Sequence, residues 1–214
     1  MKHKLPQEIA NKSITRQDLL QRVEKDFSLL PVVLDGISSP KAAVRYGCAS
    51  VLMDLSRAYP EKLYPHMDSL IALLDSEYRI LRWNAMAIIA NLARVDEDRK
   101  FDAIFAKYYS FLNDEYMVTV ANVVGNSGKI ALAKPYLAQR IADELLKVEN
   151  ISTTPHLTEE CKRVISEKAI ESFDMFFSQI KKKEKIVDFV KSQLSSPRKT
   201  LKAKAEFFLK KWNQ

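Results

Sequence analysis

The chain contains the stretch VRYGCASVLMDLSR at residues 44–57, and the same pattern returns as LRWNAMAIIANLAR at residues 81–94. The two stretches keep a constant offset of 37 residues, from position 44 to position 81. Within each stretch, apolar residues recur at the three- and four-residue spacing that places side chains on one face of a helix. A period of this length is typical of stacked supersecondary units, which bury their apolar faces only against their neighbours.

Two further matches extend the period along the chain. Residues 74–78 resemble residues 112–116 at an offset of 38. Residues 37–48 resemble residues 194–205 at an offset of 157, which is close to four periods. Because the matches span the chain, we expect about five stacked units, each a pair of helices.

Ser-Pro pairs mark the expected start of the second helix of a unit. Ser39 and Pro40 precede the first quoted stretch, and Ser196 and Pro197 occupy the matching place near the C-terminal end. A Ser can accept a hydrogen bond from a free amide at a helix start, and Pro fits the first helical position because its missing N–H would be unbonded there. We therefore predict helices that begin at these pairs.

The sequence predicts an all-α fold, a right-handed α-solenoid of about five helix pairs, in a single domain over residues 1–214. Residues 1–15 are expected to be a lead-in or cap, residues 16–134 the three clearest repeats, and residues 135–214 two divergent repeats with a basic C-terminal end. The expected units are residues 16–59, 61–96, 100–134, 135–181 and 183–214.

Units three and four depart from the pattern. Residues 125–128, Gly-Asn-Ser-Gly, fall inside the second helix of unit three, where each Gly costs about 1 kcal/mol relative to Ala. Close packing of a neighbouring backbone, or a bend in the superhelix, would explain them. Residues 150–158 contain Ser-Thr-Thr-Pro and lengthen the turn inside unit four. This loop is either a tolerated insertion or a functional protrusion.

Composition favours a helical protein inside the cell. Only four of the 214 residues are glycine. No apolar run reaches the ~20 residues that span a bilayer, and the first residues lack the apolar segment of a signal peptide. Cys48 and Cys161 are far apart among apolar residues at helical spacing, which indicates reduced core thiols. We therefore predict a cytoplasmic location and no membrane partner.

The positive charge is concentrated at one end of the chain. The net charge is +7, yet residues 179–214 alone hold eleven Lys or Arg and three acidic residues. The remaining residues are therefore close to neutral, and only the C-terminal part is a candidate for binding anions.

Residues 40–55, PKAAVRYGCASVLMDL, resemble the second half of a HEAT repeat, which has a turn with Asp and Pro, a Val-Arg pair, and then small and large apolar residues. Residues 81–92 repeat this pattern well, and residues 201–209 repeat it tolerably. The chain departs from the family pattern where Asp is usual, with Ser39, Ser76 and Ser196, and has Thr119-Val120 where Val-Arg is usual. The resemblance covers about three quarters of the chain.

The resemblance to the HEAT-like (armadillo/HEAT) family implies an architecture and a class of function. Proteins of this family are mostly binding scaffolds, which implies a non-enzymatic protein that holds a protein partner. One branch, the HEAT-like alkylpurine DNA glycosylases, is catalytic. Such an enzyme would need a carboxylate and an aromatic pocket near Trp83 or Trp212, because base excision requires a snug pocket around the flipped base. The sequence places no carboxylate to serve one.

Repeat geometry selects candidate partner-binding residues. If the apolar stripe of each second helix faces the core, the opposite side lines the concave surface expected of such arrays. Aromatic and Arg residues then occupy equivalent positions in consecutive units, and these types dominate protein interfaces. In the alternative interpretation, the aromatic residues pack between second helices and the arginines complement helix C-termini. The candidates are Tyr46, Arg57, Trp83, Asn91 and Arg94.

The basic end is a second candidate surface. Its lysines and arginine could neutralise phosphates, or they could only solubilise a terminal cap. Phe189, Phe207 and Phe208 fall at core spacing and not as stacking platforms, so nucleic-acid binding ranks below protein binding. The candidates for binding an anion are Lys181, Lys182, Lys183, Lys185, Arg198, Lys199 and Lys202.

The sequence predicts no catalytic residue, cofactor or metal. His3, His66 and His156 are widely separated and have no partnering Cys pair. The acidic residues 96–98 lie at a helix end beside arginines, which favours a solvated turn over paired catalytic acids. The identity of the partner is not encoded in any motif.

Overall fold

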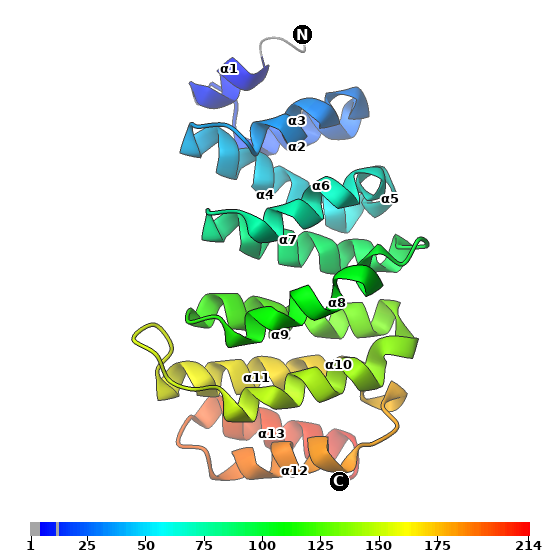
Figure 1. The fold of residues 1–214 in the computed structure, drawn as a ribbon, viewed down its shortest axis with the longest axis vertical. Coiled ribbons are helices and arrows are strands. Elements are labelled where there is room, and N and C mark those ends of the chain that lie inside the picture. Colours follow the sequence, from blue (N-terminus) through cyan, green and yellow to red (C-terminus); the bar gives the residue numbers. More distant parts are fainter. Residues whose placement is uncertain (1–4, 12) are drawn as a thin grey trace. The chain divides into compact units, whose positions relative to one another are not determined.

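The computed structural model describes residues 5–11 and 13–214, which are predominantly helical and contain no strand. Figure 1 colours the helices in chain order. The described residues form two compact units that divide after Lys100. A lone bridge between Thr154 and Leu157 is the only strand-like pairing in this part of the chain.

The first compact unit holds seven α-helices joined by short 3-10 segments. The α-helices are α1 (Leu5–Ala10), α2 (Arg16–Lys25), α3 (Leu30–Gly36), α4 (Ala42–Ala58), α5 (Pro60–Leu63), α6 (Met67–Ala72) and α7 (Arg79–Leu92). The 3-10 segments are η1 (Phe27–Leu29), η2 (Tyr64–His66), η3 (Leu73–Asp75) and η4 (Ala93–Val95).

The second compact unit continues the same alternation. Its α-helices are α8 (Lys100–Ser110), α9 (Met117–Ala133), α10 (Ala138–Leu145), α11 (Glu159–Phe176), α12 (Glu184–Ser192) and α13 (Lys199–Lys211). The 3-10 segments are η5 (Phe111–Asn113), η6 (Pro135–Leu137), η7 (Leu146–Asn150), η8 (Phe177–Gln179) and η9 (Gln193–Ser195).

The predicted five repeats are confirmed. The second helices are α4, α7, α9, α11 and α13, and each follows a first element of shorter helices. Second helices pack on each other, α4 on α7 in the first compact unit, and α9 on α11 and α11 on α13 in the second. The single domain over residues 1–214 stays a prediction. Residues 1–4 and 12 of the predicted lead-in lie outside the described residues, and α1 packs on α3 and α4.

The first elements of repeats one, two and four are broken rather than continuous helices. Pro31 lies in the first turn of α3, Pro65 in η2 and Pro135 in η6. Proline removes one backbone donor and clashes with the preceding turn of a helix, so the chain restarts at each of these positions. The first two repeats therefore have three α-helices each, where the sequence suggested two.

The prediction that second helices begin at Ser-Pro pairs is wrong. Helix α4 begins at Ala42 and α13 at Lys199, and neither start has a side-chain cap. Ser39 Oγ accepts a hydrogen bond from the N–H of Lys41 instead, at 3.3 Å, and Ser196 makes the same bond to Arg198. Such a turn lies outside the helix and competes with capping. Ser76 and Asp114 repeat it three residues before α7 and α9.

The two cysteines differ in burial. Cys48 is fully buried in α4, and this burial raises the pKa of its thiol to about 11. The prediction that Cys161 is also a core thiol is wrong, because the residue is half-buried in the first turn of α11, with Thr158 Oγ1 3.3 Å from its Sγ. Both thiols are free.

Close packing explains one of the two glycines inside α9. A Cβ added at Gly128 would lie 3.2 Å from the Cα and the carbonyl oxygen of Ser172 in α11 and 2.6 Å from Met175 Sδ. The same addition at Gly125 would lie 3.6 Å from Lys168, an ordinary contact. Gly128 is therefore the position where the backbone of α9 closely approaches the backbone of α11 at Ser172, and α9 remains helical through both glycines.

The loop before α11 folds back on the preceding repeat. Thr154 Oγ1 donates a hydrogen bond to the carbonyl of Glu115 at 2.7 Å, and the N–H of Met117 donates to the carbonyl of His156 at 3.4 Å. The rings of Tyr116 and His156 stack with centroids 4.3 Å apart. The predicted long turn is thus present, and it is anchored to the start of α9.

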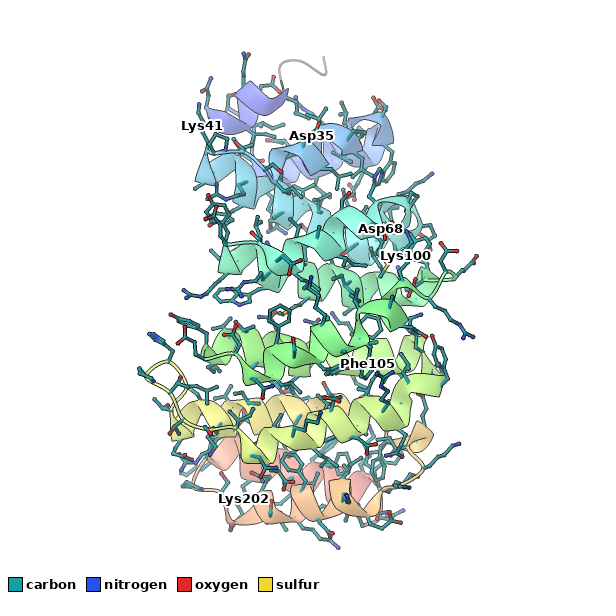
Figure 2. All side chains as sticks on the ribbon, viewed as in Figure 1. Asp35, Lys41, Asp68, Lys100, Phe105 and Lys202 are labelled. Atoms are coloured by element: carbon teal, nitrogen blue, oxygen red, sulfur yellow. The ribbon has the colours of Figure 1, made fainter. Side chains whose placement is uncertain are left out.

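Ion pairs of constant spacing link successive first elements. Lys100 Nζ lies 2.7 Å from Asp68 in the first compact unit, and Figure 2 shows these two side chains together. Lys134 Nζ lies 3.7 Å from Asp102 in the second. Each Asp is 32 residues before its Lys, and the second pair follows the first by 34 residues, so a repeat also appears in polar contacts that the apolar pattern does not reveal. No helix of the described residues is long and apolar enough to cross a membrane.

Candidate functional site

The second-helix face is the name used here for the solvent-accessible side chains of α4, α7, α9, α11 and α13. The side chains that point from these helices toward the first elements are buried. The face therefore carries what the second helices can offer to a partner. It holds four of the five predicted partner-binding residues, and the fifth, Arg94, lies in η4 directly after α7.

The predicted aromatic residues of this face are less exposed than the sequence suggested. Tyr46 and Trp83 are both half-buried, because α4 and α7 pack side by side. The guanidinium of Arg45 lies 4.8 Å from the ring centre of Tyr46 and 3.7 Å from that of Tyr78. The expectation that Tyr46 and Trp83 are exposed is therefore wrong, because both residues are half-buried.

The polar candidates join α7 to α4. Asn91 donates to Ser56 Oγ at 2.9 Å, and Arg94 donates to the carbonyl of Arg57 at 2.8 Å, near the C-terminal end of α4. Arg57 lies 3.7 Å from Asp54 of its own helix. Arg94 therefore has the contact with a helix C-terminus that the alternative interpretation expected, and Asn91 makes a further contact between the two helices. Arg57 and Arg94 remain exposed. Their role in partner binding stays a prediction.

The second helices also carry exposed apolar side chains that the sequence reasoning missed. Among the described residues, seven large hydrophobic side chains are exposed, and five belong to second helices while none belongs to an α-helix of a first element. Exposed apolar clusters of this kind mark interaction sites. The five are Ile80, Val118, Leu132, Met175 and Phe207.

Phe207 is the clearest correction. The sequence reasoning placed it at core spacing, yet its side chain is 63% exposed, whereas Phe208 is 1% exposed. Leu201, Ala205 and Phe208 follow the core spacing of four and three residues, and Phe207 lies about 100° away from Phe208 on the helix. A strict count of helical positions would have separated the two phenylalanines.

An apolar groove of about 460 Å³ lies beside Phe207, between α11 and α13. Apolar side chains form most of its accessible surface, and charged side chains lie at its edge. It is open to solvent on the second-helix face. Its lining residues are Ile170, Glu171, Asp174, Thr200, Ala203, Lys204, Phe207 and Phe208.

Four acidic side chains of α11 form ion pairs with basic side chains at the start of and within α13. These ion pairs are called the α11–α13 seam. Arg198 Nε lies 2.7 Å from Glu167 and its NH1 pairs with Glu160. Lys204 pairs with Glu171, and Lys211 lies 2.8 Å from Asp174. The predicted anion-binding Arg198 is therefore already engaged within the protein.

The seam shifts the titration of its carboxyl groups. Hydrogen bonds from Arg198 and Arg163 lower the pKa of Glu160. Burial raises the pKa of Glu167, but the hydrogen bonds from Arg198 and Thr200 outweigh it, so the pKa lies below its ordinary value. Burial likewise raises the pKa of Glu171, but hydrogen bonds from Lys168 and Lys204 outweigh it, so this pKa also lies below its ordinary value. All three carboxylates are therefore charged and paired near neutral pH.

The other predicted anion-binding residues are divided between two places. The backbone N–H groups of Lys181 and Lys182 donate to Gln139 Oε1 at 3.1 and 2.9 Å, in the segment before α12 that also holds Lys183. Lys185 lies in α12, which is a first element. Lys199 and Lys202 lie in α13, where Figure 2 labels Lys202. The predicted anion-binding residues therefore do not form a single surface on a second helix.

The acidic residues 96–98 form a structural turn. Asp96 is buried, and its Oδ1 accepts from the N–H of Lys100 at 2.8 Å and lies 3.0 Å from the hydroxyl of Tyr64. Burial raises the pKa of Tyr64 to about 12. The expectation of a solvated turn is wrong for Asp96, because its carboxylate holds the start of α8.

A carboxylate does lie beside one of the two tryptophans, contrary to the sequence reasoning. Trp212 Nε1 donates to Asp174 Oδ1 at 2.8 Å, and Lys211 holds the other oxygen. The indole packs 5.0 Å from Phe177, centre to centre. Both oxygens of Asp174 are therefore used in holding α13 on α11. No cluster of three or more potential metal ligands occurs within residues 5–11 and 13–214.

No protein-family model and no curated protein matches this chain. Solved structures do. A designed armadillo repeat protein is 19% identical with a TM-score of 0.59, and computationally designed armadillo repeat proteins for modular peptide recognition match at 19% and 0.60. A designed armadillo repeat protein in complex with the peptide (KR)4 is 16% identical with a TM-score of 0.59. Each similarity covers 98% of this chain and 90% of the other.

These similarities span the chain at low identity, so they show the fold and not a shared function. They agree with the helical repeats that the structure shows. The chain has an armadillo/HEAT-like repeat fold and is an all-α solenoid.

Proposed function

We propose that this chain is a non-enzymatic scaffold that binds a protein or peptide partner along its second-helix face, the face predicted to be concave. One observation carries the proposal: five of the seven exposed large apolar side chains of the described residues belong to second helices, and none belongs to an α-helix of a first element. A solvated face gains nothing from exposed Leu, Met and Phe, whereas a partner can bury them.

Two of these side chains lie close together. Leu132 is one helical turn after Gly128 in α9, and Gly128 is in contact with Met175 of α11. Leu132 and Met175, which are 45% and 42% exposed, therefore form an apolar patch across two repeats. Interfaces draw most of their binding energy from a few such anchors.

The similar structures and the location of the thiols support the proposal. One of the similar designed proteins was solved with a bound peptide, which supports a peptide as the kind of partner for this fold. Cys48 is a free, buried thiol, which suits a reducing compartment and a cytoplasmic location. Nucleic-acid binding through the basic end is the weaker alternative, because Arg198 is neutralised by the α11–α13 seam.

Capture of the native partner should depend on second helices. With tagged protein and native host lysate, we expect Leu132→Lys and Trp83→Ala each to reduce partner capture about tenfold, since burying an unpaired charge or removing an aromatic anchor costs about 1.4 kcal/mol or more. Ala106→Lys is the matched control, because it adds the same charge at an exposed position of α8, a first element.

Capture is measured by quantitative mass spectrometry, and thermal melting of each variant reports on folding. Equal capture by Leu132→Lys and Ala106→Lys would contradict the proposal. If Trp83→Ala has a lower melting temperature but captures the partner as well as the parent does, Trp83 acts in packing alone.

A further inference from the structure

We propose that the groove between α11 and α13 binds a bulky apolar side chain of an acidic peptide segment, whose carboxylates pair with Lys199 and Lys210. This inference deepens the proposed function and rests on it. It names the chemistry of the partner at one position of the second-helix face.

The groove has the shape and lining of a side-chain pocket. Its volume is about 460 Å³, and Ile170, Ala203 and Phe208 contribute apolar surface. The exposed ring of Phe207 forms one wall. A leucine or phenylalanine side chain entering the groove would cover this ring, which otherwise remains in water.

The rim of the groove on α13 is basic. Residues 199, 203, 207 and 210 are four, four and three residues apart, so they share one face of the helix. This face places a lysine on either side of Ala203 and Phe207. No acidic side chain of the described residues pairs with Lys199 or Lys210, whereas Lys202 lies 4.0 Å from Glu206.

The rim on α11 is acidic but already paired. Glu171 binds Lys204, and Asp174 binds Lys211 and the indole of Trp212. In these ion pairs, the lysines of α13 neutralise the carboxylates of α11 that line the groove. Lys199 and Lys210 lie outside the groove lining, on the same side of α13 as Ala203, and have no carboxylate partner among the described residues, so they attract carboxylates in a partner next to the groove.

The same geometry favours a peptide over a nucleic acid. A single-stranded nucleic acid binds along a positively charged track with successive aromatic platforms. Here only one aromatic ring among the groove-lining residues is exposed, that of Phe207, so the groove offers no succession of platforms for bases. A peptide can place an apolar side chain in the groove and keep its acidic side chains beside Lys199 and Lys210.

The probe for this inference is a dye-labelled peptide with one central leucine between two pairs of glutamates. Binding is measured by fluorescence anisotropy at low ionic strength, where surface charges are least screened. We expect saturable binding by the full chain. Replacing the central leucine with alanine, or all glutamates with lysines, should weaken binding about tenfold or more.

Substitutions in the protein should have matching effects. We expect Phe207→Ala, Lys199→Glu and Lys210→Glu each to weaken binding of the leucine peptide about tenfold. Lys191→Glu is the matched control, since it makes the same charge change at an exposed position of α12, and it should change affinity less than about twofold. Ala203→Glu, which fills the groove from an exposed position, gives an independent check with the fold preserved.

Three outcomes would overturn the inference. The first is no binding of the leucine peptide, and the second is equal binding of the alanine peptide, which would leave only charge attraction. The third is tighter binding of a single-stranded DNA oligonucleotide that is lost on Phe207→Ala. If the peptide fails while partner capture still depends on Leu132, this inference falls and the proposed scaffold function stands; if both fail, both fall.

Discussion

Gly128→Ala should destabilise the second compact unit by about 2 kcal/mol, the typical cost of one extra carbon in a packed interior. The added Cβ would lie 3.2 Å from the Cα and carbonyl oxygen of Ser172, and backbone atoms of α11 cannot rotate away as a side chain can. The hydroxyl of Ser172 also donates to the carbonyl of Val124 at 2.6 Å, so a shift of α11 would strain this buried bond.

Gly125→Ala is the matched control in the same helix. Its Cβ would make an ordinary contact with the flexible side chain of Lys168, and alanine is favoured over glycine in helices by about 1 kcal/mol. We therefore expect this variant to be as stable as the parent or more stable. The measurement is urea unfolding followed by Trp212 fluorescence in a Trp83→Phe background. Similar losses in both variants would contradict close packing at Gly128.

Acid should loosen α13 before it unfolds the rest of the second compact unit. The folded-state pKa values of Glu160, Glu167 and Glu171 all lie below the ordinary value of 4.5. Carboxylates with lowered pKa contribute stability that is present above the ordinary pKa and is lost as the pH falls through the lowered one. The window for the loss therefore begins near pH 4.5 and extends below it.

Glu167→Gln tests the origin of this acid sensitivity. The side chain of Glu167 is only 7% exposed and serves Arg198, Thr200 and Lys204. Removing its charge should cost about 2 kcal/mol at pH 7, because Arg198 and Lys204 each lose the carboxylate partner that the nearly buried Glu167 provides. As the pH falls below 4.5 and through the lowered pKa of Glu167, protonation removes the same charge from the parent, so the difference should shrink. Trp212 fluorescence reports the transition, and a pH-independent difference would contradict the seam.

The fold could be predicted because its signal is local and repeated. The match between residues 44–57 and 81–94 depends only on helical spacing, and five units follow from its period. Two errors were also local. Whether Ser39 caps a helix or closes a turn depends on a single hydrogen bond, and Phe207 and Phe208 differ by one helical position. Neighbouring apolar residues do not show which of them faces the core.

The site was harder to predict, because its contacts join residues one repeat apart. Arg198 has opposite charges 31 and 38 residues earlier, and Arg94 reaches a backbone carbonyl at position 57, which no sequence pattern marks. Charge counting therefore made the basic end a candidate for binding anions, although the α11–α13 seam neutralises part of its charge. The exposed pair Leu132 and Met175 likewise depends on the close approach at Gly128.

The central claim is that the second-helix face binds the partner, and hydroxyl-radical footprinting of the captured complex tests it most directly. This measurement compares side-chain oxidation in free and bound protein by mass spectrometry. The account predicts that Met175 and Phe207 are protected on binding, while Tyr136, which is 54% exposed in η6, is oxidised equally in both states. Protection of Tyr136 with unchanged oxidation of Met175 and Phe207 would contradict it.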